Sequence, residues 1–134
     1  MKILVDTSAW SLFLTRKQTA RHPAAHYLKE KISEGAPLCI TGLVFQEILQ
    51  GIRSETHYQE VVGYLLNFEF LATTHSIHEK AAGLYRRCRA KGLSIGTIDA
   101  LLAACSIHHQ TPLLTTDNDF VRIQKHAPLQ LVKV

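Results

Sequence analysis

The sequence predicts an α/β fold: a three-layer α/β/α domain in which helices cover both faces of a short-stranded, mainly parallel sheet. Segments typical of strands and of helices alternate along the 134 residues. The strand candidates are short continuous apolar runs, which is typical of parallel strands buried on both faces. No repeat or long linker divides the chain, so we expect a single domain over residues 1–134.

Five apolar segments are predicted as strands. The first ends in an acid followed by Thr7 and Ser8, which favours a helix start directly after the strand. The last closes the chain and is predicted as an edge strand. The expected strands cover residues 2–6, 37–40, 69–72, 112–116 and 129–134.

Seven segments between these strands are predicted as helices. Thr41, Ser76 and Thr97 are each placed to cap the helix that follows. Gly92 marks the end of the fifth helix, because glycine commonly follows the last helical residue. The expected helices cover residues 9–14, 24–33, 42–52, 55–67, 77–91, 98–109 and 118–126.

Composition excludes several classes of protein. Hydrophobic residues make up 46% and charged residues 19%, which suits one apolar core and not a disordered tail. No apolar run approaches the roughly 20 residues that span a bilayer, and the N-terminus lacks a signal peptide pattern, so we expect a cytoplasmic protein without membrane contact. Three separated cysteines argue against a disulfide framework and predict buried side chains instead. The net charge of +4 is compatible with a polyanionic partner.

Acidic residues recur where the predicted strands end or the following helices begin. Asp6 ends the first strand, Asp117 follows the fourth, Asp99 lies in the first turn of a helix, and Glu47 lies one turn into another. Ligands of parallel α/β sheets bind at the carboxyl ends of the strands, so these acids could reach one edge. Asp119 is a possible fifth member.

Each acid also has a purely structural interpretation. Asp6 could shape a turn, Asp117 could cap a helix, Asp99 and Asp119 could complement a helix dipole, and Glu47 could face solvent. On a helical wheel, however, Glu47 and Asp99 border apolar arcs and do not lie in the middle of polar faces. For Asp99 the bordering stripe is Ile98, Leu101, Leu102 and Cys105.

Gathering these carboxylates has an electrostatic cost that a metal ion would remove. Two like charges about 4 Å apart repel by roughly 4 kcal/mol at an effective dielectric constant near 20. A cluster therefore implies raised pKa values or a bound cation. Oxygen ligands suit Mg²⁺ or Mn²⁺, which can activate water and neutralise the charge of a phosphodiester. The residues thus favour a metal-dependent nuclease.

Four segments together resemble the PIN domain, and most closely the VapC-type toxins of bacterial toxin–antitoxin pairs. The resemblance covers nearly the whole chain in order, and residues 97–120 carry its most specific part. The segments are DTSAW (6–10), VFQEILQG (44–51), TIDALLAACS (97–106) and LLTTDNDF (113–120).

The resemblance implies a Mg²⁺- or Mn²⁺-dependent endoribonuclease that inhibits translation, a homodimer, and a cognate antitoxin in hetero-oligomeric complex that blocks the site. It assigns catalysis to Asp6, Glu47, Asp99 and Asp117, and metal binding to Asp6, Asp99, Asp117 and Asp119. Thr7, Ser8, Thr115 and Thr116 would orient these carboxylates by hydrogen bonds.

Basic and apolar segments allow two interpretations each. Arg16, Lys17 and Arg21 are predicted near the site, where they could bind the RNA substrate. The basic group at 86–91 (Arg86, Arg87, Arg89 and Lys91) could complement a helix dipole or contact an RNA backbone. The apolar helix around Trp10 could be core or could be covered by a partner. Among the eight histidines, His75 and His78 could share a helical face and His108 and His109 are adjacent, but neither pair has a third ligand nearby, which argues against a zinc site.

Rival functions fit the sequence less well. A phosphoacceptor receiver domain needs an acid pair after its first strand, but Val5 and Thr7 flank Asp6. A haloacid-dehalogenase-type phosphatase needs a second Asp where Ser8 stands. The remaining alternative is a non-catalytic PIN-fold module that binds RNA or acts as a scaffold; without metal, its carboxylates would repel RNA.

Overall fold

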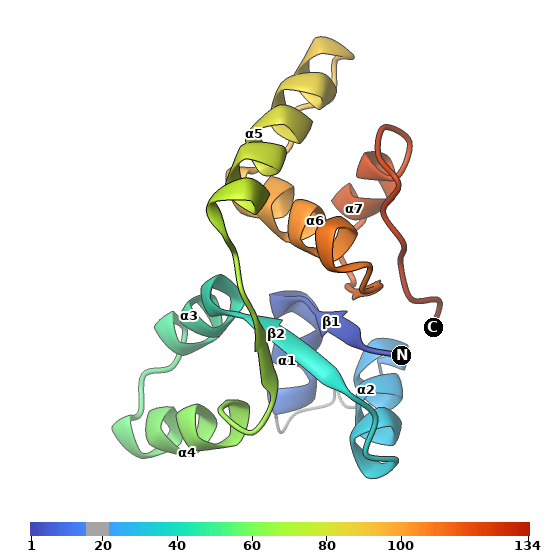
Figure 1. The fold of residues 1–134 in the computed structure, drawn as a ribbon. Helices are drawn as coiled ribbons and strands as arrows, with labels where there is room; N and C mark the ends of the chain where they lie inside the picture. Colours follow the sequence, from blue (N-terminus) through green and yellow to red (C-terminus); the bar gives the residue numbers. More distant parts are fainter. Residues whose placement is uncertain (16–21) are drawn as a thin grey trace.

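A computed structural model of the chain describes residues 1–15 and 22–134 (Figure 1). Within these residues the chain forms four strands and seven helices, which alternate much as the sequence predicts. The strands are β1 (Ile3–Val5), β2 (Leu38–Thr41), β3 (Glu69–Leu71) and β4 (Leu113–Leu114). The helices are α1 (Thr7–Leu14), α2 (Pro23–Ser33), α3 (Gly42–Gln50), α4 (Glu55–Leu65), α5 (His75–Ala90), α6 (Thr97–His109) and α7 (Asp119–Ile123).

The four strands form one parallel sheet in the order β3-β2-β1-β4. Leu4 of β1 pairs with Cys39 of β2 on one side and with Leu113 of β4 on the other. Because all strands run in the same direction, their carboxyl ends meet at one edge of the sheet. Asp6 and Thr115, which directly follow β1 and β4, are therefore brought to the same place.

Helices lie on both sides of the sheet, so the predicted α/β/α layering is confirmed. In Figure 1, α1 to α4 lie on one side and α5, α6 and α7 on the other. The continuous apolar runs of the strands are buried between the two helical layers, as Leu4, Ile40 and Leu113 illustrate. Trp10 of α1 and Phe120 of α7 are fully buried and belong to this core.

Of the three predicted helix caps, one is confirmed and two are wrong. The Thr41 hydroxyl accepts the backbone N–H of Val44 and caps α3 as expected. Helix α5 begins earlier than predicted, because Thr74 and not Ser76 accepts an N–H in its first turn. Helix α6 starts after Gly96, so Thr97 is its first residue and not its cap.

The predicted C-terminal edge strand is wrong. Residues 129–134 contribute a single parallel bridge, between Leu131 and Leu113. Strand β4 is only two residues long, and after Leu114 the chain turns into the loop that begins at Thr115. The C-terminal segment therefore finds no further residues of β4 with which to extend the pairing.

Two expectations from composition can be compared with the structure. Cys39, Cys88 and Cys105 are buried free thiols, as predicted. Burial raises the pKa of Cys105 to about 11, in keeping with an inert core residue. Across residues 1–15 and 22–134, no helix combines the length and apolar character needed to cross a membrane.

Candidate metal and catalytic site

Asp6 is fixed at the end of β1 by three hydrogen bonds. Its Oδ1 accepts the backbone N–H of Thr7 (2.7 Å), and its Oδ2 accepts the hydroxyls of Ser8 (3.0 Å) and Thr115 (2.7 Å). The residue is only 9% exposed. A carboxylate has about four acceptor positions, so one remains free for a cation. Asp6 thus caps α1 without losing its capacity as a ligand.

Hydroxyl groups join α1 to the loop that follows β4. The Oγ of Ser8 lies 3.2 Å from Oγ1 of Thr115 and accepts the backbone N–H of Thr116 (3.0 Å). Oγ1 of Thr115 also accepts the backbone N–H of Asp117 (3.0 Å). These bonds place Asp117 relative to Asp6. Thr116 takes part through its backbone N–H, whereas Ser8 and Thr115 act through their side chains.

Glu47 is held from the neighbouring helix. Its Oε1 accepts the hydroxyl of Thr7 at 2.8 Å, which links α3 to α1. Thr7 therefore contacts two acids, Asp6 through its backbone N–H and Glu47 through its side chain. Glu47 is half-buried, in agreement with its predicted place at the border of an apolar arc. Its second oxygen accepts no hydrogen bond from the described residues.

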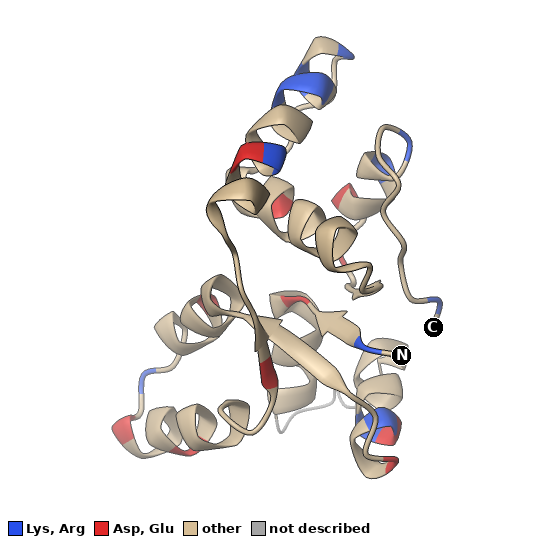
Figure 2. Ribbon diagram, viewed as in Figure 1, with Lys and Arg blue, Asp and Glu red and all other residues tan. Residues whose placement is uncertain are grey.

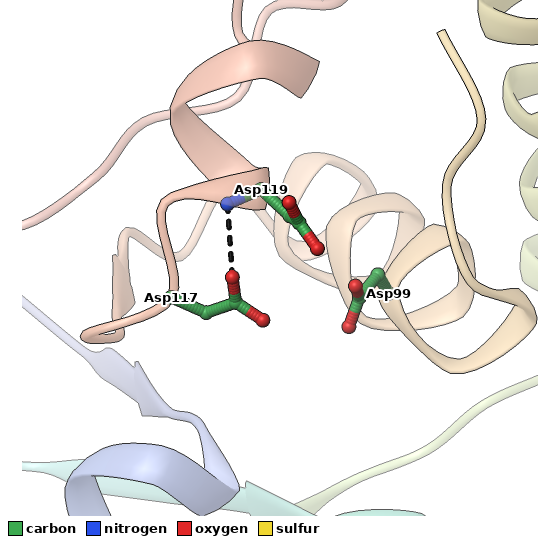
Figure 3. A group of neighbouring side chains, drawn as sticks. All are labelled: Asp99, Asp117 and Asp119. Carbon is green, nitrogen blue, oxygen red and sulfur yellow. Dashed lines mark hydrogen bonds between the residues drawn. The ribbon is translucent and has the colours of Figure 1, made fainter.

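Asp99, Asp117 and Asp119 bring one carboxylate oxygen each within 4.8 Å of one another (Figure 3). Asp99 lies in the first turn of α6, Asp117 in the loop after β4, and Asp119 at the start of α7. The Oδ1 of Asp117 accepts the backbone N–H of Asp119 at 2.9 Å. Arg122 donates to Asp119 one turn along α7.

Four of the five predicted acids line one depression of about 520 Å³ at the carboxyl edge of the sheet. Ile98 also lines it and is 39% exposed, so its predicted place in a buried stripe is wrong. The first turn of α6 borders the opening, and the helix is buried mainly from Ala100 onward. The lining residues are Asp6, Thr7, Ser8, Glu47, Gly96, Thr97, Ile98, Asp99 and Asp117.

The structure disfavours the charged form of Asp99. Burial raises its pKa from 3.8 to about 6, with further contributions from Asp117, Asp6, Asp119 and Glu47 in that order. All four other acids therefore act on Asp99 in the same direction. This is the electrostatic signature of converging carboxylates, and a divalent cation would reverse it.

The oxygens of Asp99, Asp117 and Asp119 suit a hard divalent cation. Mg²⁺ binds oxygen ligands at about 2.1 Å, so two ligating oxygens lie at most about 4.2 Å apart. A separation within 4.8 Å therefore needs only a small inward movement of side chains. Gly96 also lines the depression, and a Cβ at this position would make an ordinary contact with Oδ2 of Asp99, at 3.7 Å.

The sequence prediction overlooked two neighbours of the acids. Arg122 pairs with Asp119, and their three-residue spacing on a helix could have indicated this contact. Gly96 could have been suspected from its position before the helix that carries Asp99. The predicted RNA-binding residues Arg16, Lys17 and Arg21 lie outside the described residues.

Comparison with known proteins identifies the family of this chain. The sequence profile of the PIN domain matches residues 3–126, which include all five acids. The chain belongs to the PIN domain family. Ribonuclease VapC51 from Mycobacterium tuberculosis is 30% identical to it over 121 residues, which are 90% of this chain and 83% of that protein.

Solved structures share the PIN fold. VapBC2 from Rickettsia felis, bound to a DNA fragment from its promoter, gives a TM-score of 0.79 at 20% identity and covers 98% of each chain. VapC20 from Mycobacterium tuberculosis, a toxin that cleaves the sarcin-ricin loop, gives 0.69 at 17% identity, with coverage of 90% of this chain and 93% of that one. At these identities the likeness establishes the fold.

Proposed function

We propose that this chain is a Mg²⁺- or Mn²⁺-dependent endoribonuclease that hydrolyses RNA phosphodiester bonds within a single PIN-like domain, residues 1–134. One observation carries the proposal: acids from four separate segments converge at the carboxyl edge of the sheet, and together with burial they raise the pKa of Asp99 to about 6. The similarity to Ribonuclease VapC51 supports RNA as the substrate.

The acids have distinct proposed roles. Asp99, Asp117, Asp119 and the free acceptor position of Asp6 hold the metal, and Asp6, Glu47, Asp99 and Asp117 form the catalytic group. Bound Mg²⁺ or Mn²⁺ supplies a nucleophilic water at neutral pH and neutralises charge on the phosphodiester.

The hydroxyl network gives this site its order. Ser8 and Thr115 fix Asp6 by hydrogen bonds, so its remaining acceptor position has a defined direction. Thr7 occupies Oε1 of Glu47 and leaves Oε2 as the atom that can take a proton from the attacking water. Residues that orient a ligand in this way often affect activity by roughly 10- to 100-fold.

The alternative is a non-catalytic PIN-fold module that binds RNA or acts as a scaffold. An RNA-binding surface gains affinity from cations, and uncompensated carboxylates repel the phosphates. The depression is lined by four acids, and among residues 1–15 and 22–134 no Lys or Arg lines it. These charges favour a metal-assisted enzyme over a simple RNA-binding surface.

We further propose that the enzyme is the toxin of a toxin–antitoxin pair and inhibits translation in the cytoplasm. It would form a homodimer, and a cognate antitoxin would join it in a hetero-oligomer and block the acidic depression. Support comes from the similarity to VapC51 and from structural neighbours that are VapBC complexes. One structural neighbour, VapC20, is a toxin that cleaves the sarcin-ricin loop.

The direct test is cleavage of total RNA by the purified chain, with 5′ ends mapped by sequencing. We expect no cleavage in EDTA, recovery with Mg²⁺ or Mn²⁺, and loss of cleavage in Asp99→Asn. The control is Glu55→Gln, an exposed acid of α4 outside the depression, which should cleave normally. Cleavage in excess EDTA, or full activity of Asp99→Asn, contradicts the proposed mechanism.

A further inference from the structure

The part of α5 farthest from the sheet is strongly basic. The basic group at 86–91 is exposed, and Figure 2 shows Lys and Arg concentrated toward this end of the helix. Over the described ranges 1–15 and 22–134, none of its four members forms an ion pair with an acid. Arg87 and Arg89 lie in the last turn of α5, where they also complement the helix dipole, and Arg86 lies one residue before that turn.

Two hollows meet on this helix. One of about 670 Å³ is lined by Gly83, Arg86, Arg87, Arg89 and Ala90. A second of about 300 Å³ lies between α5, α6 and Pro128, and Gly83 and Arg87 line both. The two hollows adjoin at Gly83 and Arg87 and are here together called the basic furrow. The second hollow is lined by Glu79, Lys80, Gly83, Leu84, Arg87, Ala104, Ile107 and Pro128.

Gly83 lines both hollows of the basic furrow. Glycine is unfavourable inside a helix, and a structural need for it is not evident here. The φ angle of Gly83 is not positive, and a Cβ at this position would make only an ordinary contact, 3.6 Å from Nη1 of Arg87. Gly83 lies between Lys80 and Arg87 on one helical face, three residues after the first and four before the second. Its missing side chain leaves space between two cations.

The charges of the basic furrow fit a phosphodiester chain. Arginine presents a planar fork of donors that matches phosphate oxygens. Arg89 is partly engaged over the ring of Tyr85, at 5.6 Å, which leaves Arg86 and Arg87 as the main open forks. Lys80 adds an ammonium group 3.0 Å from Nδ1 of His108. Glu79 is the single acid among the lining residues.

We propose that the basic furrow binds the RNA backbone at a distance from the cleavage site. The inference rests on the proposed function, which makes RNA the substrate. Helix α5 packs on α6, and α6 carries Asp99 in its first turn, so one helical pair presents both the basic furrow and the acidic depression. An RNA chain of sufficient length contacts both, whereas a short oligonucleotide reaches only the acids.

The first experiment removes charge. We compare Arg86→Gln/Arg87→Gln with the control Lys29→Gln/Lys133→Gln, which removes two exposed cations elsewhere. The probe is a fluorescein-labelled uridine RNA of about 20 nucleotides, which is longer than typical single-strand binding sites of about 4–16 nucleotides. Its binding is measured by fluorescence anisotropy in EDTA at several salt concentrations. We expect roughly tenfold weaker binding and a salt slope smaller by about 1.4, or about 0.7 for each lost phosphate contact, in the arginine variant only.

The second experiment blocks the basic furrow without changing its charge. Gly83→Gln places a neutral side chain between Lys80 and Arg87, and the better helix former should raise the unfolding temperature. We expect several-fold weaker binding of the same RNA by a protein that is at least as stable as the wild type. Unchanged RNA binding by both Gly83→Gln and the arginine variant overturns the proposal.

Cleavage assays separate this inference from the proposed function. With about 20-nucleotide RNA the arginine variant should show a raised KM and an unchanged kcat, and with about 4-nucleotide RNA it should match the wild type. If the wild type cleaves no RNA but the arginine variant still loses RNA binding, the cleavage proposal fails, whereas the proposal that the basic furrow binds RNA stands. If the variants lose binding of a poly-glutamate peptide but not of RNA, the furrow serves an acidic protein partner and the RNA proposal is overturned.

Discussion

The two halves of the acidic site are built differently. Asp6 and Glu47, on the α1–α3 side, are held by four hydrogen bonds from Thr7, Ser8 and Thr115. Asp99, on the α6 side, faces Asp117 and Asp119, and within the described part of the chain its carboxylate accepts no hydrogen bond. One half is ordered by the protein itself, and the other is a group of like charges.

This difference separates two physical tasks. Hydrogen bonds to an ionised carboxylate stabilise it and fix its direction. Burial and like charges raise the pKa of Asp99 to about 6, so folding places a disfavoured charge at this position. We therefore expect the Asp6 half to stabilise the metal-free fold. We expect the Asp99 half to stabilise the fold only when a metal ion is bound. The experiments below perturb one half of the acidic site at a time, and they measure stability as an unfolding temperature or as a free energy of unfolding.

The largest effect should come from adding metal. A ligand that binds only the folded state stabilises it by about 2.7 kcal/mol at a concentration 100 times its Kd. We expect Mn²⁺ to raise the unfolding temperature of the wild type and to have little effect on Asp99→Asn. Cation binding requires ionised Asp99, whose pKa is about 6. The rise in unfolding temperature that Mn²⁺ causes should therefore shrink as the pH falls below 6. An equal Mn²⁺ effect in both proteins would place the metal elsewhere.

The next largest effect should come from Asp6→Ala without metal. The change leaves the Thr7 N–H and the Ser8 and Thr115 hydroxyls without their charged acceptor, which should destabilise the fold by about 2 kcal/mol. Urea unfolding in EDTA measures this loss in the free energy of unfolding.

Asp117→Ala is the matched control for Asp6→Ala. The Asp117 carboxylate accepts one backbone N–H, is exposed and repels Asp99, so its loss should change stability by less than about 0.5 kcal/mol. Equal losses for Asp6→Ala and Asp117→Ala would remove the contrast between the two halves.

Sequence patterns were sufficient where local order decides the structure. The apolar runs gave the four parallel strands, and the strand ends correctly placed Asp6 and Asp117 at one edge. The four segments that resemble the PIN domain anticipated the family. The convergence of Glu47 on the same depression also agrees with the prediction, because α3 directly follows β2 and starts at that edge. Helix α6 follows α5 and not a strand, so the place of Asp99 depends on how these two helices pack.

The remaining features depend on tertiary packing. Thr74 replaces Ser76 as a cap because the start of α5 depends on where the chain leaves the sheet, which the local sequence does not reveal. The C-terminal segment reaches a strand too short to extend the pairing beyond Leu131. The hydrogen bond between Thr7 and Glu47 joins residues forty positions apart, and spacing alone cannot predict it. The furrow at Gly83 likewise depends on how α5 packs against α6.

Asp99→Asn without metal should have a smaller effect than Asp6→Ala and in the opposite direction, as a gain in stability. The folded-state pKa is raised to about 6 from 3.8, so the contribution of Asp99 to stability is fully present below pH 3.8 and is lost as the pH rises through 6. At about pH 7.5 the folded protein therefore carries an unfavourable charge, and asparagine should relieve on the order of 1 kcal/mol because the site is partly exposed to solvent. The unfolding temperature in EDTA should rise by about 2 to 6 °C at that pH, and the gain should vanish toward pH 3.8.

Asp119→Asn is the comparison, because its carboxylate is paired with Arg122 and its loss should be nearly neutral. A clear drop in the unfolding temperature of Asp99→Asn at about pH 7.5 would mean that Asp99 stabilises the metal-free fold, and the contrast between the two halves would then be wrong.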